Sequence, residues 1–138
     1  MIVPQPRTNE ERFAVEDAMR RFRAESGASD SFTFRDLVLR WARLVETLEA
    51  GPYVLSFSDY IHDLQQREAT ETICRALPSP FRDEVAALLA HLDSRFRFAT
   101  NETDQPLLDA DLGEAFWWRR LPKSVGTEFT EEMASRDY

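Results

Sequence analysis

Apolar residues recur at helical spacing along most of the chain, and this periodicity constrains the fold more than any other feature of the sequence. In the clearest stretch, 81–96, large apolar residues stand four, three, four and four positions apart, which is the spacing of one face of an α-helix. Ser79-Pro80 precedes the stretch, and serine followed by proline is typical of a helix start. An amphipathic helix is therefore predicted, and its apolar face consists of Phe81, Val85, Leu88, Leu92 and Phe96.

Two earlier helices are predicted from the same periodicity and from residues that start or stop helices. The first begins at Thr8 or Asn9 and ends near Gly27. The second is capped by Thr33 and ended by Gly51, which proline follows. The apolar residues assigned to their buried faces are Val15, Met19, Phe22, Leu37, Trp41, Leu44 and Leu48.

A further helix is predicted between these two and the helix at 81–96. Residues 53–57 are expected to be an extended lead-in, after which the helix runs to about Leu77. Its middle, 65–72, is polar, so it is expected to be exposed or kinked. Its apolar residues are Phe57, Tyr60, Ile61, Leu64, Ile73 and Leu77.

These elements predict an all-α fold: a compact bundle of four main helices with a long acidic and aromatic loop and a short C-terminal helix. The last helix is capped by Thr127 or Thr130 and reaches Arg136. With 138 residues and no visible repeat, the chain is expected to form one domain over 1–138, with 1–7 and 137–138 frayed.

Composition excludes several classes of function. The net charge is −8, and a chain this acidic is repelled by phosphate backbones, so nucleic-acid binding is not expected. No window approaches the ~18 consecutive apolar residues that a bilayer requires, so no membrane association is expected. Cys74 is the single cysteine, which excludes an internal disulfide and favours a reducing compartment. We therefore expect a cytoplasmic protein.

No residue pattern indicates catalysis, a metal or a cofactor. Asp59 and His62 stand three apart, as in carboxylate-bridged dimetal bundles, but His91 has no acidic residue at the matching position. Cys74 lacks a cysteine-protease signature, and no serine occupies a nucleophile elbow. The scattered glycines fit no phosphate-binding loop. We expect neither enzyme activity nor a cofactor nor a metal site.

The segment 101–122 is the most unusual part of the chain, because an acidic stretch meets paired tryptophans and paired arginines. Tryptophan and arginine are enriched among the residues that dominate the binding energy of protein interfaces. In an extended segment neighbouring side chains point opposite ways, so one indole could enter the core while the other faces out. Alternatively, Phe116, Trp117 and Leu121 cover the open end of the bundle. The residues assigned to partner binding are Glu102, Asp104, Asp109, Asp111, Glu114, Trp117, Trp118, Arg119 and Arg120.

Three stretches carry a resemblance to small bacterial helical proteins of unknown function, some of them of the immunity-protein type. They are Tyr60…Leu64…Arg67…Ile73…Leu77-Pro78, Leu92-Asp93-Ser94-Arg95-Phe96-Arg97…Thr100 and Trp117-Trp118-Arg119-Arg120-Leu121-Pro122. The resemblance spans about residues 53–122 and includes no catalytic signature. It implies tight capture of a toxin, without indicating which toxin or which contact residues.

The sequence supports two hypotheses of function. The first is a cytoplasmic module that neutralises or regulates a protein partner, such as an immunity protein or small inhibitor of a basic toxin, because negative charge speeds encounter with a basic protein. The second is a self-associating structural or adaptor subunit, in which an apolar face of the second or fourth main helix forms a homodimer.

Overall fold

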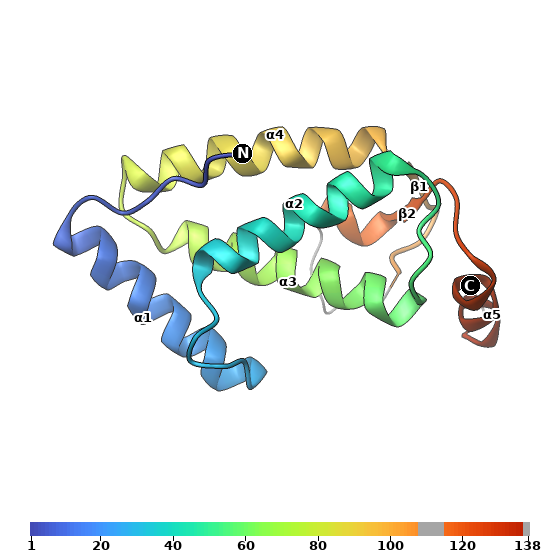
Figure 1. Ribbon diagram of the computed structural model, residues 1–138, viewed down its shortest axis with the longest axis horizontal. Coiled ribbons are helices and arrows are strands. Elements are labelled where there is room, and N and C mark those ends of the chain that lie inside the picture. The colour runs from blue at the N-terminus through green and yellow to red at the C-terminus, as the bar shows by residue number, and fades with distance from the viewer. Residues whose placement is uncertain (108–114, 137–138) are drawn as a thin grey trace. The chain divides into compact units, whose positions relative to one another are not determined.

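The computed structural model describes residues 1–107 and 115–136, most of which are helical (Figure 1). Within them the chain forms five α-helices, two short strands and one 3-10 helix, η2. Their bounds are α1 Asn9–Ser26, α2 Phe34–Ala50, α3 Phe57–Arg75, α4 Phe81–Phe98, β1 Thr100–Glu102, η2 Phe116–Arg119, β2 Arg120–Pro122 and α5 Thr127–Ser135. The predicted helices are therefore present, whereas the prediction of a strictly all-α fold is wrong.

Short polar side chains start α1, α2 and α3 where the sequence predicts, whereas the predicted cap of α5 by Thr127 or Thr130 is wrong, because Gly126 precedes that helix and no side chain caps it. The Thr8 hydroxyl accepts a hydrogen bond from the Glu11 N–H, and the Glu11 carboxylate accepts one from the Thr8 N–H. Gly27 ends α1 in the left-handed conformation, with φ of 74°, which glycine adopts without steric cost. Side chains and backbone also bond reciprocally at the starts of α2 and α3, in the pairs Thr33 with Asp36 and Ser56 with Asp59.

Helix α4 differs in two details from its prediction. The sequence predicts Ser79 as the cap of this helix, but the hydrogen bond that its hydroxyl accepts comes from the Arg82 guanidinium, 3.1 Å away. The Ser79-Pro80 peptide is cis. Leu89 is buried, whereas Leu88 is only half-buried. Either leucine continues a helical face after Val85, so packing in the folded chain decides between them.

The chain divides into two compact units, and each is assembled from two separate stretches of sequence. Unit 1 consists of Met1–Ala42 and Gln66–Leu92, and unit 2 of Arg43–Gln65 and Asp93–Tyr138. Helices α2, α3 and α4 each contribute residues to both units. The single domain and the bundle arrangement of the four main helices stay predictions.

Unit 1 contains α1, the first half of α2, the second half of α3 and most of α4. The N-terminal segment runs beside the beginning of α4 (Figure 1), where Arg7 Nη1 lies 2.6 Å from Glu84 Oε1. The polar middle of α3 is not simply exposed, because Arg67 and Thr70 are buried. Arg67 pairs with Glu71 at 2.9 Å, and the Thr70 hydroxyl donates to the Gln66 carbonyl, so the interior accommodates both polar groups.

Unit 2 has an aromatic core around α5. The Phe129 ring meets the rings of Phe57, Tyr53 and Tyr60 edge-on, with centroids 5.4, 5.8 and 5.9 Å apart. The predicted lead-in 53–57 is shorter than expected, because α3 begins at Phe57, and it has a partner that the sequence did not reveal. Tyr53 bridges Val125 in parallel, its N–H donating to the Ser124 carbonyl at 2.9 Å.

Strands β1 and β2 form a small antiparallel sheet, which corrects the all-α prediction (Figure 1). Thr100 pairs with Pro122, and Glu102 pairs with Arg120. Each strand has three residues and the two lie far apart in the sequence, so neither shows the alternation by which a strand is recognised. Among the described residues, no helix has both the length and the apolar character needed to cross a bilayer.

Candidate protein-docking surface

The nine residues that the sequence assigns to partner binding all belong to unit 2, but they have different surroundings. Asp109, Asp111 and Glu114 lie outside the described residues. The other six are Glu102, Asp104 and Arg119, which are exposed, Arg120, which is half-buried, and Trp117 and Trp118, which are buried.

The two tryptophans belong to the interior, with Trp117 4% exposed and Trp118 2% exposed. Of the two possibilities raised by the sequence, an outward-facing indole does not occur, because that possibility requires an extended segment. Residues 116–119 form η2 instead, and neighbouring side chains of a 3-10 helix lie about 120° apart, so both indoles can point inward. The Trp118 carbonyl accepts a hydrogen bond from the Leu107 N–H at 2.7 Å. In this conformation neither indole is exposed on the surface of the chain.

The two arginines also have separate roles. Arg120 Nε donates to Thr100 Oγ1 at 2.8 Å, and Arg120 Nη2 donates to the carbonyls of Arg97 and Thr100, each at 2.9 Å. Its guanidinium therefore joins β1, β2 and the end of α4. Arg119 is exposed and makes one long hydrogen bond, 3.4 Å, to the Asp104 carbonyl. Of the paired arginines, only Arg119 is available to a partner.

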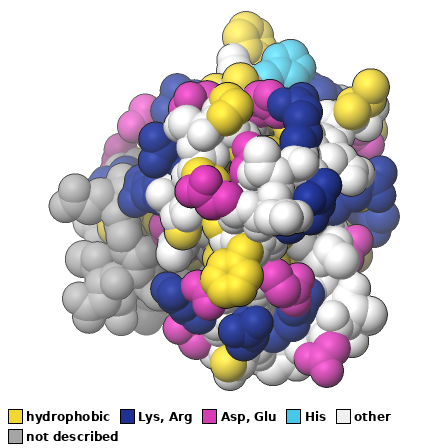
Figure 2. Space-filling view, turned by 90° about the vertical axis from the view of Figure 1, so that its left-hand side faces the viewer, with side chains coloured by type: hydrophobic (Ala, Val, Ile, Leu, Met, Phe, Trp, Pro, Cys, Tyr) yellow, Lys and Arg dark blue, Asp and Glu magenta, His cyan; other side chains and the backbone are white. Residues whose placement is uncertain are grey.

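The negative charge of the chain is concentrated in unit 2. By sequence the stretches of this unit have 14 acidic and 7 basic residues, a net charge of −7, whereas those of unit 1 have 11 and 10, a net charge of −1. The two values add to the −8 of the whole chain. Four of the 14 acidic residues, Asp109, Asp111, Glu114 and Asp137, lie outside the described residues. Figure 2 views the molecule from the side on which α1 of unit 1 lies in Figure 1, and there acidic and basic side chains are interspersed. Most of the acidic surplus therefore lies in the sequence stretches of unit 2.

Some acidic side chains of unit 2 are already engaged. Glu49 forms an ion pair with Arg95, and Glu132 accepts hydrogen bonds from Ser58, whose hydroxyl contributes most to lowering the pKa of Glu132. Others are exposed, and within the described residues their carboxylates have no hydrogen bond or ion pair. These available carboxylates include those of Glu102, Asp104, Glu128 and Glu131.

Large apolar side chains are also exposed in unit 2. Phe98, at the end of α4, is 84% exposed, and Val54 and Leu55, in the connection between α2 and α3, are 70% and 51% exposed. Isolated exposed apolar residues are ordinary on protein surfaces. Here they are the apolar groups of unit 2 that a partner can reach, since the indoles are buried.

The residues considered for metal binding and catalysis are not gathered into a site. His62 and His91 are exposed, and the Asp59 carboxylate accepts a hydrogen bond from the Ser56 hydroxyl at 2.9 Å. Over 1–107 and 115–136, no three potential metal ligands lie together. Burial raises the pKa of the Cys74 thiol, which favours the protonated and less nucleophilic form.

Comparisons with protein-family models, with curated proteins and with solved structures found no match. Sequence reasoning missed the concentration of charge in one unit, because unit 2 joins two stretches that are remote in sequence. The one available signal was the absence of basic residues between 101 and 114.

Proposed function

We propose that the chain is a cytoplasmic protein-binding module that neutralises or regulates a basic protein partner, as an immunity protein or a small inhibitor of a basic toxin does. Unit 2 makes the contact. The observation that carries this proposal is the net charge of −7 in unit 2 against −1 in unit 1.

A negative charge placed in one unit raises the rate at which the chain and a basic partner associate. Complementary fields raise association rates from an ordinary ~10⁵–10⁶ M⁻¹s⁻¹ towards ~10⁸–10⁹ M⁻¹s⁻¹ at low salt. The exposed carboxylates need little desolvation before they meet arginine or lysine side chains of a partner, since they remain at the rim of a contact. Negative charge of this kind suits a partner whose own surface is basic, as that of a nuclease is.

Affinity also needs apolar contact, which charge at the rim does not supply. In this structure the exposed Phe98, Val54 and Leu55 can supply it, whereas Trp117 and Trp118 are buried. Phe98, Val54 and Leu55 therefore take the place of Trp117 and Trp118 as the apolar contact residues. The exposed Glu102, Asp104 and Arg119 are kept as contact residues.

The test compares three forms of the full chain as bait in an extract of the native host. The unit 2 variant carries Glu102→Gln, Asp104→Asn, Glu128→Gln and Glu131→Gln. Its matched control carries the same change of charge in unit 1, at residues whose carboxylates are likewise exposed and unpaired within the described part of the chain: Glu10→Gln, Glu25→Gln, Asp30→Asn and Asp83→Asn.

We expect a basic protein to be retained by the wild-type chain and by the unit 1 variant, and lost or strongly reduced with the unit 2 variant. Circular dichroism checks that all three forms keep their helical content. Retention of the same proteins by all three forms, or of no basic protein by any form, would contradict the proposal.

Self-association is the second candidate, and the exposed Phe98 ring on α4 favours it. The apolar stripe of α2 does not, because Leu37, Trp41, Leu44 and Leu48 are buried within the chain. Sedimentation at micromolar concentration distinguishes the readings. A stable dimer of the wild-type chain that Phe98→Ser converts to a monomer supports self-association. If the wild-type chain is a monomer, self-association is ruled out.

A further inference from the structure

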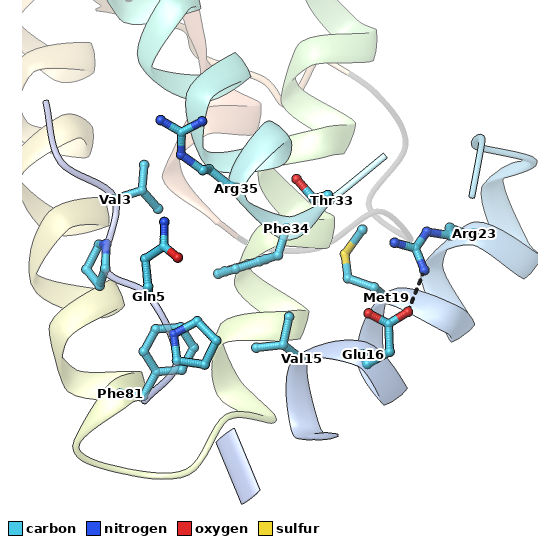
Figure 3. A pocket seen from close by; sticks show the side chains of 12 residues that line it. Val3, Gln5, Val15, Glu16, Met19, Arg23, Thr33, Phe34, Arg35 and Phe81 are labelled. Atoms are coloured by element: carbon cyan, nitrogen blue, oxygen red, sulfur yellow. Dashed lines mark hydrogen bonds and ion pairs between the residues drawn. The ribbon is translucent and has the colours of Figure 1, made fainter. Parts of the chain in front are cut away.

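Unit 1 contains a cavity of about 300 Å³ that the proposed partner contact does not use (Figure 3). Its walls come from the N-terminal segment Val3–Pro6, one face of α1, the first residues of α2 and the first residue of α4. The volume is at the lower end of the range for small-molecule pockets, about 300–1,000 Å³. The cavity therefore has room for a small ligand.

The inner wall of the cavity is formed by buried apolar residues. Val3, Met19, Phe34 and Phe81 line it, and each of these residues is at most 5% exposed. Figure 3 shows the ring of Phe34 between the N-terminal segment and Val15 of α1. Such a wall favours an apolar body and offers it no hydrogen-bonding group.

The N-terminal wall is held at both ends, so the cavity is formed before any ligand arrives. Val3 is buried at one end. At the other end, Arg7 Nη1 lies 2.6 Å from Glu84 Oε1, and the Arg7 N–H donates to the Glu11 carboxylate at 2.8 Å. Pro4 and Pro6 between these ends restrict the backbone. A preformed wall lowers the entropy lost on binding.

Among the charged groups that line the cavity, Arg35 is the one available to a ligand. Glu16 and Arg23 neutralise each other at 3.0 Å, and Arg23 also donates to the Phe32 carbonyl. Asp36, which follows Arg35, accepts hydrogen bonds from the Thr33 N–H and hydroxyl at 2.9 and 3.0 Å. The Arg35 guanidinium has no hydrogen bond or ion pair over 1–107 and 115–136. It lies on the same side of the cavity as the Gln5 amide in Figure 3.

We infer that this cavity binds a small carboxylate with an apolar body, with the carboxylate on Arg35 and the body against Met19, Phe34 and Phe81. Arginine matches a carboxylate with paired N–H groups, and such charge-assisted bonds are stronger than neutral ones. The amide of Gln5 can donate to the same carboxylate. The inference does not depend on the protein-binding role, because unit 2 contributes no residue to the cavity.

The test is titration of the full chain with octanoate and with 3-phenylpropanoate, followed by calorimetry and by the NMR shifts of the Val15 and Met19 methyl groups. Octanol and octylamine are the matched ligands that keep the apolar body and lack the negative charge. We expect saturable binding of the two carboxylates, weaker binding of octanol and none of octylamine. Folded protein that binds neither carboxylate, or that binds octanol equally well, overturns the inference.

Two variants locate the site. Arg35→Gln removes the charge from an exposed residue and should weaken carboxylate binding about tenfold. The matched control, Arg43→Gln, makes the same change at another exposed arginine of α2 and should leave binding unchanged. Val15→Trp fills the cavity and should abolish binding while the circular dichroism spectrum keeps its helical signal. Equal affinities of the Arg35→Gln and Arg43→Gln forms would also overturn the inference.

Discussion

Arg67 shows how a single residue can depart from what its local sequence suggests. It lies in the polar middle of α3, yet it is 2% exposed, with Nη1 2.9 Å from Glu71 Oε2 and the guanidinium 5.7 Å from the centre of the Trp41 ring. A buried charge is costly unless it is paired, and here a carboxylate and an aromatic ring supply the compensation. Removing the arginine alone therefore leaves the Glu71 carboxylate without this partner.

At this residue we predict that Arg67→Ala lowers the free energy of unfolding by about 1–3 kcal/mol, the cost of removing one partner of a buried polar contact, because Glu71 is partly exposed. Arg75→Ala is the matched control, since Arg75 approaches the same carboxylate at 3.5 Å but is 78% exposed. It should cost less than about 1 kcal/mol. Denaturant titration measures both values, and equal losses in the two variants would show that the burial of Arg67 contributes nothing.

At the scale of elements, helix starts and stops could be predicted from the sequence because they depend on neighbouring residues. Thr8 and Gly27 bound α1 through contacts within a few residues of themselves. Contacts between remote stretches could not be predicted in the same way. The β1–β2 sheet and the bridge from Tyr53 to Val125 join stretches that only the folded chain brings together.

The cap of α1 predicts a dependence of stability on pH. Hydrogen bonds from the Arg7 and Thr8 N–H groups lower the pKa of Glu11. A carboxyl group whose pKa is lowered by folding stabilises the protein above its ordinary pKa, about 4.3, and this contribution is lost as the pH falls through the lowered value. Glu11→Gln keeps an oxygen that accepts both bonds but cannot titrate. We expect its unfolding midpoint in urea to fall less between pH 5 and pH 3 than that of the wild-type chain; identical falls contradict this role of Glu11.

Helix α5 is attached to unit 2 chiefly through Phe129, which is buried among Tyr53, Phe57 and Tyr60. We predict that Phe129→Ala lowers the free energy of unfolding by about 3–5 kcal/mol, as removal of a buried phenylalanine ring does. Amide hydrogen exchange should also become faster throughout 127–135. Glu131→Ala, at an exposed position of the same helix, is the control and should leave exchange unchanged. Unchanged protection of α5 in the Phe129 variant would contradict the packing described.

At the scale of the whole molecule, the sequence predicted an acidic chain but not where the charge lies. The acidic stretch 101–114, which belongs to unit 2, was predicted to bind a partner, and the exposure of Glu102 and Asp104 is consistent with that prediction. The assignment of the two tryptophans to partner binding does not agree with the structure, because they are buried. Their burial depends on tertiary packing, which the periodicity of the sequence does not describe. Glu128 and Glu131 were missed because α5 joins the acidic unit only through tertiary contacts.

The central claim is that the acidic surplus of unit 2 makes it the docking surface for a basic partner. The most direct measurement titrates the isotope-labelled full chain with an arginine-rich peptide and records every assigned amide shift. The account predicts that the shifts concentrate in 43–65, 93–107 and 115–136, and that they diminish as salt screens the charges. Shifts spread evenly over the chain, or centred on unit 1, would contradict it.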